Sequence, residues 1–98
     1  MKIYKYEANN ETGEIVKSTF EVLGVDKDEA GTDKYIIQGG AVSKFFDFDR
    51  VGNPVWLNHD DEKLARRYIA KFFEDSLALV QEQTRRIKRV IKAVNAED

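Results

Sequence analysis

Residues 64–94 read LARRYIAKFFEDSLALVQEQTRRIKRVIKAV, and this stretch decides the fold. Side chains that are all apolar except Thr84 recur along it at steps of four, four, three, four, three, four and three residues: Ile69, Phe73, Leu77, Val80, Thr84, Ile87, Ile91 and Val94. This spacing keeps the side chains on one face of an α-helix. Neither Gly nor Pro occurs from Lys63 to Asp98. We therefore predict one long helix over residues 58–95.

The apolar face of this helix changes width along its length. A second stripe, Leu64, Tyr68 and Phe72, flanks the first one in its N-terminal half only. A wide apolar face suits packing on a sheet, whereas a narrow seam with steps of three and four suits packing against another helix. We expect the first half of the helix to lie on a sheet and the second half to lie against a helix.

The predicted helix is also longer than the strands that it would cover. At 1.5 Å per residue it measures about 55 Å, whereas a six-residue strand spans about 20 Å. It would overhang the sheet and expose apolar side chains near its C-terminus: Ile87, Val90, Ile91 and Val94. Three arrangements would cover them: a second copy of the chain, a different protein, or a break near residues 74–76 that folds the helix back.

Polar residues mark the start of the helix. Asn58 suits the N-cap position, and Asp61 follows three residues later, as in a variant capping box. Asp60, Asp61 and Glu62 would lie at the positive end of the helix dipole.

The region before the helix, residues 1–57, has the alternation and the turn residues that are typical of short strands. The predicted strands are 2–8, 15–25, 35–37, 42–48 and 55–57. No helical pattern separates them, which favours antiparallel over parallel pairing. We predict a single domain of the α+β class, residues 1–98, in which an antiparallel sheet of four to five strands packs in two layers against one long C-terminal helix.

The composition excludes several classes of protein. The 98 residues carry 16 basic and 18 acidic side chains, for a net charge of −2, and 42% of them are hydrophobic, which suits a packed core. Cysteine is absent, which excludes disulfides, thiolate zinc sites and cysteine nucleophiles. No apolar run approaches the roughly 20 residues of a membrane span, and the charged start at residues 1–5 is unlike a signal peptide. We expect a cytoplasmic protein with no membrane partner.

No residue pattern indicates catalysis or a bound cofactor. His59 is the single histidine, and zinc needs more nitrogen or sulfur ligands than it supplies. The segment 26–33 begins like a calcium loop, but Ala30 and Ile37 stand where oxygen ligands are needed. The serines have no nucleophile motif around them, and the lysines have no phosphate-binding loop. We expect no metal, no cofactor and no enzymatic activity.

A basic cluster lies in the last third of the predicted helix: Arg85, Arg86, Lys88, Arg89 and Lys92, with no acidic residue between Glu82 and Glu97. Cations near the C-terminus of a helix complement its dipole and keep it solvated. The same charges would suit contact with an acidic protein surface or with nucleic-acid phosphates. The acidic balance of the whole chain favours the solvated helix end, and the two binding interpretations stay open beside it.

Aromatic side chains supply a second candidate surface. Phe45 and Phe46 are adjacent in a predicted strand, so their side chains point to opposite faces of the sheet. One helix covers one face, which leaves apolar surface on the other. This surface is either the open half of an ordinary sheet or an interface with aromatic anchors, for which we select Phe45 and Trp56.

The start of the chain reads Met1-Lys2-Ile3-Tyr4-Lys5-Tyr6-Glu7, and a hairpin leads from it to Phe20-Glu21-Val22. Asp33-Lys34-Tyr35 follows, and the late helix opens with acidic residues. This pattern resembles small accessory proteins of phages and mobile elements of Gram-positive bacteria. The resemblance implies a protein that binds a host enzyme or its nucleic acid, as anti-CRISPR inhibitors do, and it brings no functional residues with it.

We therefore expect a non-enzymatic protein-binding module whose partner is a host or phage protein, with inhibition of a host enzyme such as a CRISPR nuclease as its effect. Homodimerisation through the C-terminal helix is the simplest way to cover the overhang. The alternative is a nucleic-acid-binding accessory protein that acts through the basic cluster.

Overall fold

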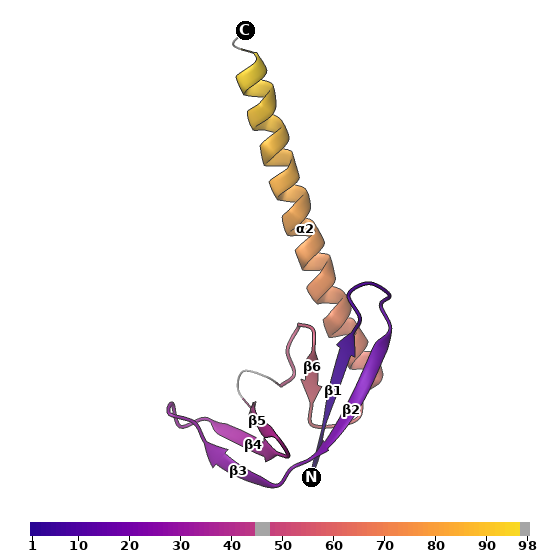
Figure 1. Ribbon diagram of the computed structural model, residues 1–98, viewed down its shortest axis with the longest axis vertical. Coiled ribbons are helices and arrows are strands. Elements are labelled where there is room, and N and C mark those ends of the chain that lie inside the picture. Colours follow the sequence, from indigo (N-terminus) through magenta and orange to yellow (C-terminus); the bar gives the residue numbers. More distant parts are fainter. Residues whose placement is uncertain (45–47, 97–98) are drawn as a thin grey trace.

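The computed structural model describes residues 1–44 and 48–96 of the chain. These residues form two small antiparallel sheets and one long helix (Figure 1). The elements are β1 (Lys2–Ala8), β2 (Ile15–Glu21), β3 (Gly24–Lys27), β4 (Asp33–Ile37), β5 (Gly40–Ser43), β6 (Val55–Leu57) and α2 (Glu62–Asn95). The α+β class predicted from the sequence is confirmed.

The first sheet has the strand order β2-β1-β6. β1 and β2 form the expected hairpin, in register from Lys2 opposite Glu21 to Ala8 opposite Ile15. β6 returns to the free side of β1 and places Val55 opposite Tyr6. The sheet thus pairs the first strand of the N-terminal region with the last one, β6, and four residues (58–61) then lead to α2.

The second sheet is a three-stranded meander with the order β3-β4-β5. The β3–β4 turn is held by Asp28, whose carboxylate accepts hydrogen bonds from the backbone N–H groups of Ala30 and Thr32 at 3.0 and 2.9 Å. Gly31, in the same turn, has a φ of +81°, a conformation that side chains with a Cβ rarely adopt. The acidic segment 26–33 therefore serves a hairpin turn.

A single sheet of four to five strands is not confirmed, because the predicted strand 15–25 divides between the two sheets. The backbone N–H of Val22 donates to the carbonyl of Met1 in the first sheet at 2.9 Å. The next N–H, that of Leu23, donates to the carbonyl of Ile36 in the second sheet at 2.7 Å. Alternation of side chains continues through this point, so the sequence pattern does not reveal the change of hydrogen-bonding partner.

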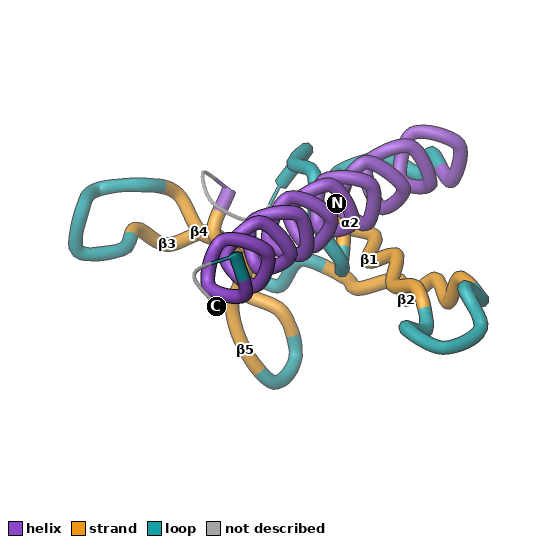
Figure 2. The backbone as a smooth tube through the Cα atoms, turned by 90° about the horizontal axis from the view of Figure 1, so that it is seen from above, coloured by secondary structure: helices purple, strands orange, loops and turns teal. Residues whose placement is uncertain are grey.

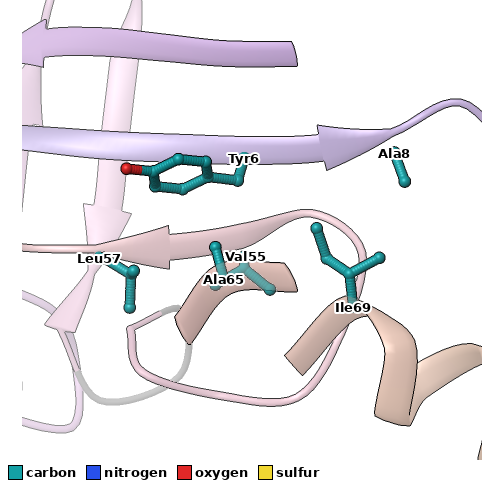
Figure 3. Packing of buried hydrophobic residues seen from close by; sticks show 6 residues of the cluster. All are labelled: Tyr6, Ala8, Val55, Leu57, Ala65 and Ile69. Atoms are coloured by element: carbon teal, nitrogen blue, oxygen red, sulfur yellow. The ribbon is translucent and has the colours of Figure 1, made fainter. Parts of the chain in front are cut away.

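The main core lies between α2 and the first sheet. Its buried side chains come from β1, β6 and the first two turns of the helix (Figure 3): Tyr6, Ala8, Val55, Leu57, Ala65 and Ile69. Ala65 is fully buried, and its small side chain lets the helix approach the strands closely.

A second core covers the opposite face of β1 and β6. Ile3 is fully buried there with three residues of the second sheet, Tyr35, Ile37 and Val42. Phe20 and Trp56 pack against this cluster. Trp56, which the sequence predicts on the face away from the helix, is therefore partly covered by the second sheet of the same chain.

The helix starts later than predicted. Asp61, not Asn58, is the N-cap, because the Asp61 carboxylate accepts a hydrogen bond from the N–H of Leu64 at 3.0 Å. Asn58 instead lies 2.9 Å from the His59 ring through its side-chain oxygen. From Glu62 the helix continues without a break through residues 74–76 to Asn95. The predicted strand 42–48 is β5 as far as Ser43, and its residues 45–47 lie outside the described part of the chain.

Candidate binding surface on the projecting helix

Most of α2 has no contact with the sheets. Its buried residues are Ala65 and Ile69, in the first two turns. Every residue from 70 to 96 is exposed, and the helix rises clear of the strands (Figure 1). Seen from above, β3 and β4 lie on one side of the helix line, and β1, β2 and β5 lie on the other (Figure 2). We call residues 70–95 the overhang; at 1.5 Å per residue they extend about 40 Å, within a longest molecular dimension of 67 Å.

The overhang begins earlier than the sequence analysis predicts, because the sheet ends early. The wide apolar stretch was expected to pack on strands, yet Phe72 and Phe73 are each 38% exposed. β6 contains three residues and β1 ends at Ala8, so no strand lies beneath these phenylalanines. The short apolar run at Val55–Leu57 was the signal in the sequence that the supporting sheet is small.

One face of the overhang is apolar along its whole length. We call its central stripe the seam: Phe73, Leu77, Val80, Thr84, Ile87, Ile91 and Val94. The predicted interface residues Ile87, Val90, Ile91 and Val94 are 54–64% exposed and lie together on or beside the seam. Steps of four and three residues define a heptad pattern over three repeats, the pattern of helices that pack against helices.

The basic cluster lies mostly on the other side of the helix. Arg85, Lys88, Arg89 and Lys92 follow the spacing i, i+3, i+4 and i+7, so they share one face, centred about 120° around the axis from the seam. Glu82 pairs with Arg85 at 4.0 Å and with Arg89 at 3.8 Å. Arg86 instead borders the seam beside Ile87 and Val90. The overhang thus separates an apolar face from a basic one.

The overhang has little support of its own. Its ion pairs within the helix include Lys71 with Asp75 at 2.8 Å and Glu82 with Arg85, and each such pair on a helix surface contributes only about 0.2–0.5 kcal/mol. Six of its residues are β-branched and lose rotamer freedom in a helix: Val80, Thr84, Ile87, Val90, Ile91 and Val94. In proteins, most helix stability comes from the packing of an amphipathic face against another element, and the overhang has no such packing within the described residues.

The two predicted aromatic anchors do not join this surface. Trp56 is half-buried in β6, where its ring packs on Phe20 with centroids 5.5 Å apart and lies 5.7 Å from the Lys5 ammonium. Phe45 lies outside the described residues. A role for either residue in binding stays a prediction.

A polar cluster at the base of α2 fixes the helix to the sheet. The buried Tyr6 hydroxyl donates to the Asp60 carboxylate, which also lies 3.0 Å from Lys17. These hydrogen bonds, from Tyr6 first and then Lys17, lower the pKa of Asp60. Burial, followed by the bond to Asp60, strongly raises the pKa of Tyr6. The cluster has a structural use, because it joins β1, β2 and the residues that precede α2.

The described residues contain no group of three or more His, Cys, Asp or Glu that could hold a metal ion. Within the same residues, no helix is long and apolar enough to cross a membrane. No family model, curated protein or solved structure matches the chain. Functional inference therefore depends on the chemistry of the overhang itself.

Proposed function

We propose that the chain is a non-enzymatic protein-binding module and that the overhang of α2 is its binding element. The observation that carries the proposal is the exposed seam, an apolar stripe that no part of the described chain covers. Contiguous apolar surface of this kind is rare on monomers and typical of interaction sites. An amphipathic helix commonly lays such a face into a groove or against another helix.

The heptad spacing favours a helical partner surface over a flat sheet. A cover for the seam is either a second copy of the chain, which would make a homodimer, or a helical face of a host or phage protein. Inhibition of a host enzyme, such as a CRISPR nuclease, is a refinement of the proposal. It is supported by the resemblance of the sequence to phage accessory proteins. It is tested by measuring whether the chain inhibits any enzyme that it retains from a bacterial lysate.

Nucleic-acid binding is the second candidate, and the exposed basic face favours it. Arg85, Lys88, Arg89 and Lys92 would face a phosphate backbone together while the seam stays turned away. This binding would lose affinity steeply with salt, because each neutralised phosphate releases counterions. It predicts that Arg85→Gln with Arg89→Gln reduces the salt slope, whereas seam substitutions leave it unchanged.

The experiment compares three forms of the chain as bait in a bacterial lysate, with and without nuclease treatment. Ile87→Asp places a charge on the seam, and Ala78→Asp adds the same charge on the opposite face of the helix. The proposal predicts a stoichiometric protein, either a second copy or a different chain, that is retained by the native form and Ala78→Asp and is lost with Ile87→Asp.

Equal retention by all three forms would show that the seam is not the binding element. Recovery that disappears with nuclease, for the native form as well, would support the basic face in its place.

A further inference from the structure

We propose that the seam is covered by a second copy of the chain, in an antiparallel pair of α2 helices. The inference rests on the proposed function and names its partner. The pair is specified by three core layers, each present twice by symmetry: Phe73 with Ile91, Leu77 with Ile87, and Val80 with Thr84. Three independent features of the overhang carry this arrangement: its heptad residues, its length and its charge distribution.

The heptad residues suit an antiparallel pair better than a parallel one. If Leu77, Thr84 and Ile91 occupy position a, then Val80, Ile87 and Val94 occupy position d. Parallel dimers favour β-branched residues at a and Leu at d. Here all three d residues are β-branched and the one leucine, Leu77, is at a. In an antiparallel pair, each a residue meets a d residue of the other helix, so this distinction disappears.

The length of the overhang selects the register. The proposed layers are symmetric about residue 82, because 73 and 91, 77 and 87, and 80 and 84 are equidistant from it. The midpoint of the overhang, residues 70–95, lies between residues 82 and 83. The second helix would therefore end, at its own Asn95, beside Ile69, where burial against the sheet stops. A shift by one heptad in one direction would leave the exposed Phe73 without a partner residue in the overhang, and a shift in the other direction would carry the end of the second helix onto the turns that pack against the sheet.

The charges of the overhang are complementary only when the helices run in opposite directions. Its first half carries Glu74, Asp75 and Glu82 against a single cation, Lys71. Its second half carries the five cations of the basic cluster and no acidic residue. An antiparallel pair places the acidic half of each helix beside the basic half of the other, whereas a parallel pair sets five cations beside five.

Within this register, one pair of flanking charges is opposed directly. Glu74 and Lys88 both occupy position e, and in the antiparallel arrangement Glu74 lies across from Lys88 of the second copy, twice per dimer. Glu74, which is exposed and on the flank of the seam, would thereby gain a cation from the other chain. The remaining position-e layer pairs Gln81 with its own copy.

Disulfide cross-linking tests the direction and the register together. The chain has no native cysteine, so Leu77→Cys and Ile87→Cys each provide a unique thiol on an exposed part of the helix. The proposal predicts that an oxidised mixture of the two variants, one of them carrying a mass tag, forms the heterodimer in excess over either homodimer. Homodimers formed by each variant alone would indicate a parallel pair and overturn the proposal.

A charge exchange provides a second test with its own internal control. Glu74→Lys would place a lysine across from Lys88 of the second copy, twice per dimer, and should weaken self-association about tenfold. Glu74→Lys with Lys88→Glu should restore it. Circular dichroism confirms in each case that the fold is retained. If the native chain has the mass of a monomer at all concentrations, or if the exchange fails to restore association, the antiparallel pair is wrong. The proposed function is tested separately, by whether the native chain retains a different protein that Ile87→Asp loses.

Discussion

At the scale of single residues, the side chain of Asn53 makes the hydrogen bonds that a strand backbone would otherwise make. Asn53 accepts a hydrogen bond from the N–H of Ala8 at 2.9 Å and donates one to the Ala8 carbonyl at 3.0 Å. Ala8 lies two residues beyond Tyr6, and Asn53 lies two residues before Val55, which is the partner of Tyr6. The Asn53 amide therefore continues the β1–β6 ladder where the backbone of β6 has not yet begun.

This role predicts a specific loss of stability. Asn53→Ala leaves both backbone groups of the buried Ala8 without these partners and should cost about 1–3 kcal/mol in the free energy of unfolding. Asn53→Asp keeps the acceptor and removes the donor, so it should cost less at neutral pH. Asn10→Ala, in the nearby exposed turn, is the control. Urea denaturation measures all three, and a loss no greater than that of the control would contradict the role of Asn53.

Tyr6 predicts how stability depends on pH. Its pKa is raised in the folded chain by burial and by its bond to Asp60, so folding favours the protonated hydroxyl. The unfolded chain ionises a tyrosine near pH 10. The contribution of Tyr6 is therefore present in full below about pH 10 and is lost as the pH rises above it.

Tyr6→Phe should flatten the decline of the urea midpoint between about pH 9 and 11. Tyr68 also has a raised pKa, from its hydrogen bond to Asp49, and Tyr68→Phe is therefore the comparison. The account requires a larger effect at the buried Tyr6 than at Tyr68. An alkaline decline that is the same in Tyr6→Phe as in the native chain would contradict it.

At the scale of elements, the sequence predicted those strands, and the helix, whose residues show a clear local pattern. β1 and β6 have the predicted bounds, since alternating apolar residues and flanking turn residues define both strands. The division of the predicted strand at Val22 and Leu23 depends on which carbonyls are nearby in space, and no local pattern encodes that. The N-cap is Asp61 and not Asn58, and the adjacent Asp60 is hydrogen-bonded to Tyr6 of β1, a contact over 54 residues of sequence that no local pattern encodes.

The exposed seam was predictable in part. Spacing and length identified Ile87 and its neighbours as an overhang, because helix periodicity is local. The helix periodicity did not indicate that Phe72 and Phe73 would also lie beyond the sheet, since that depends on how small the supporting sheet is, for which the short run Val55–Leu57 was the one signal. Nor did it indicate that Trp56 would be half-buried, because its cover comes from a second sheet that is distant in the topology.

Two isoleucines of α2 test the division of the helix into a packed base and a free overhang. Ile69 is 4% exposed and Ile87 is 60% exposed. Ile69→Ala should cost about 2–5 kcal/mol at any protein concentration, because it leaves a cavity in the core beneath the helix. Ile87→Ala should cost less than about 0.5 kcal/mol in dilute solution and more as concentration rises. Equal costs for the two variants, independent of concentration, would contradict this division.

At the scale of the whole molecule, stability is expected to be uneven. The sheets and the first two turns of α2 share two cores, whereas every residue of the overhang is exposed and belongs to neither core. Local opening of such an uncovered helix costs little free energy. Under the proposed pairing, protection of this segment would come from the second copy.

Hydrogen exchange should report this difference by segment. Amides of residues 70–95 should exchange quickly in dilute solution and slow down as concentration rises, whereas amides of β1 should stay protected at both concentrations. Ile87→Asp should keep the overhang in fast exchange at both concentrations. If the overhang amides exchange slowly at both concentrations, and equally slowly in Ile87→Asp, then the helix is stable without a partner and the proposal is contradicted.

The most direct measurement of the central claim is sedimentation equilibrium of the native chain and of Ile87→Asp over about 1–100 μM. The account predicts that the native chain approaches twice its mass of 11.3 kDa as concentration rises and that Ile87→Asp stays at 11.3 kDa. A native chain with the mass of a monomer throughout this range, or an Ile87→Asp chain that associates as the native one does, would contradict it.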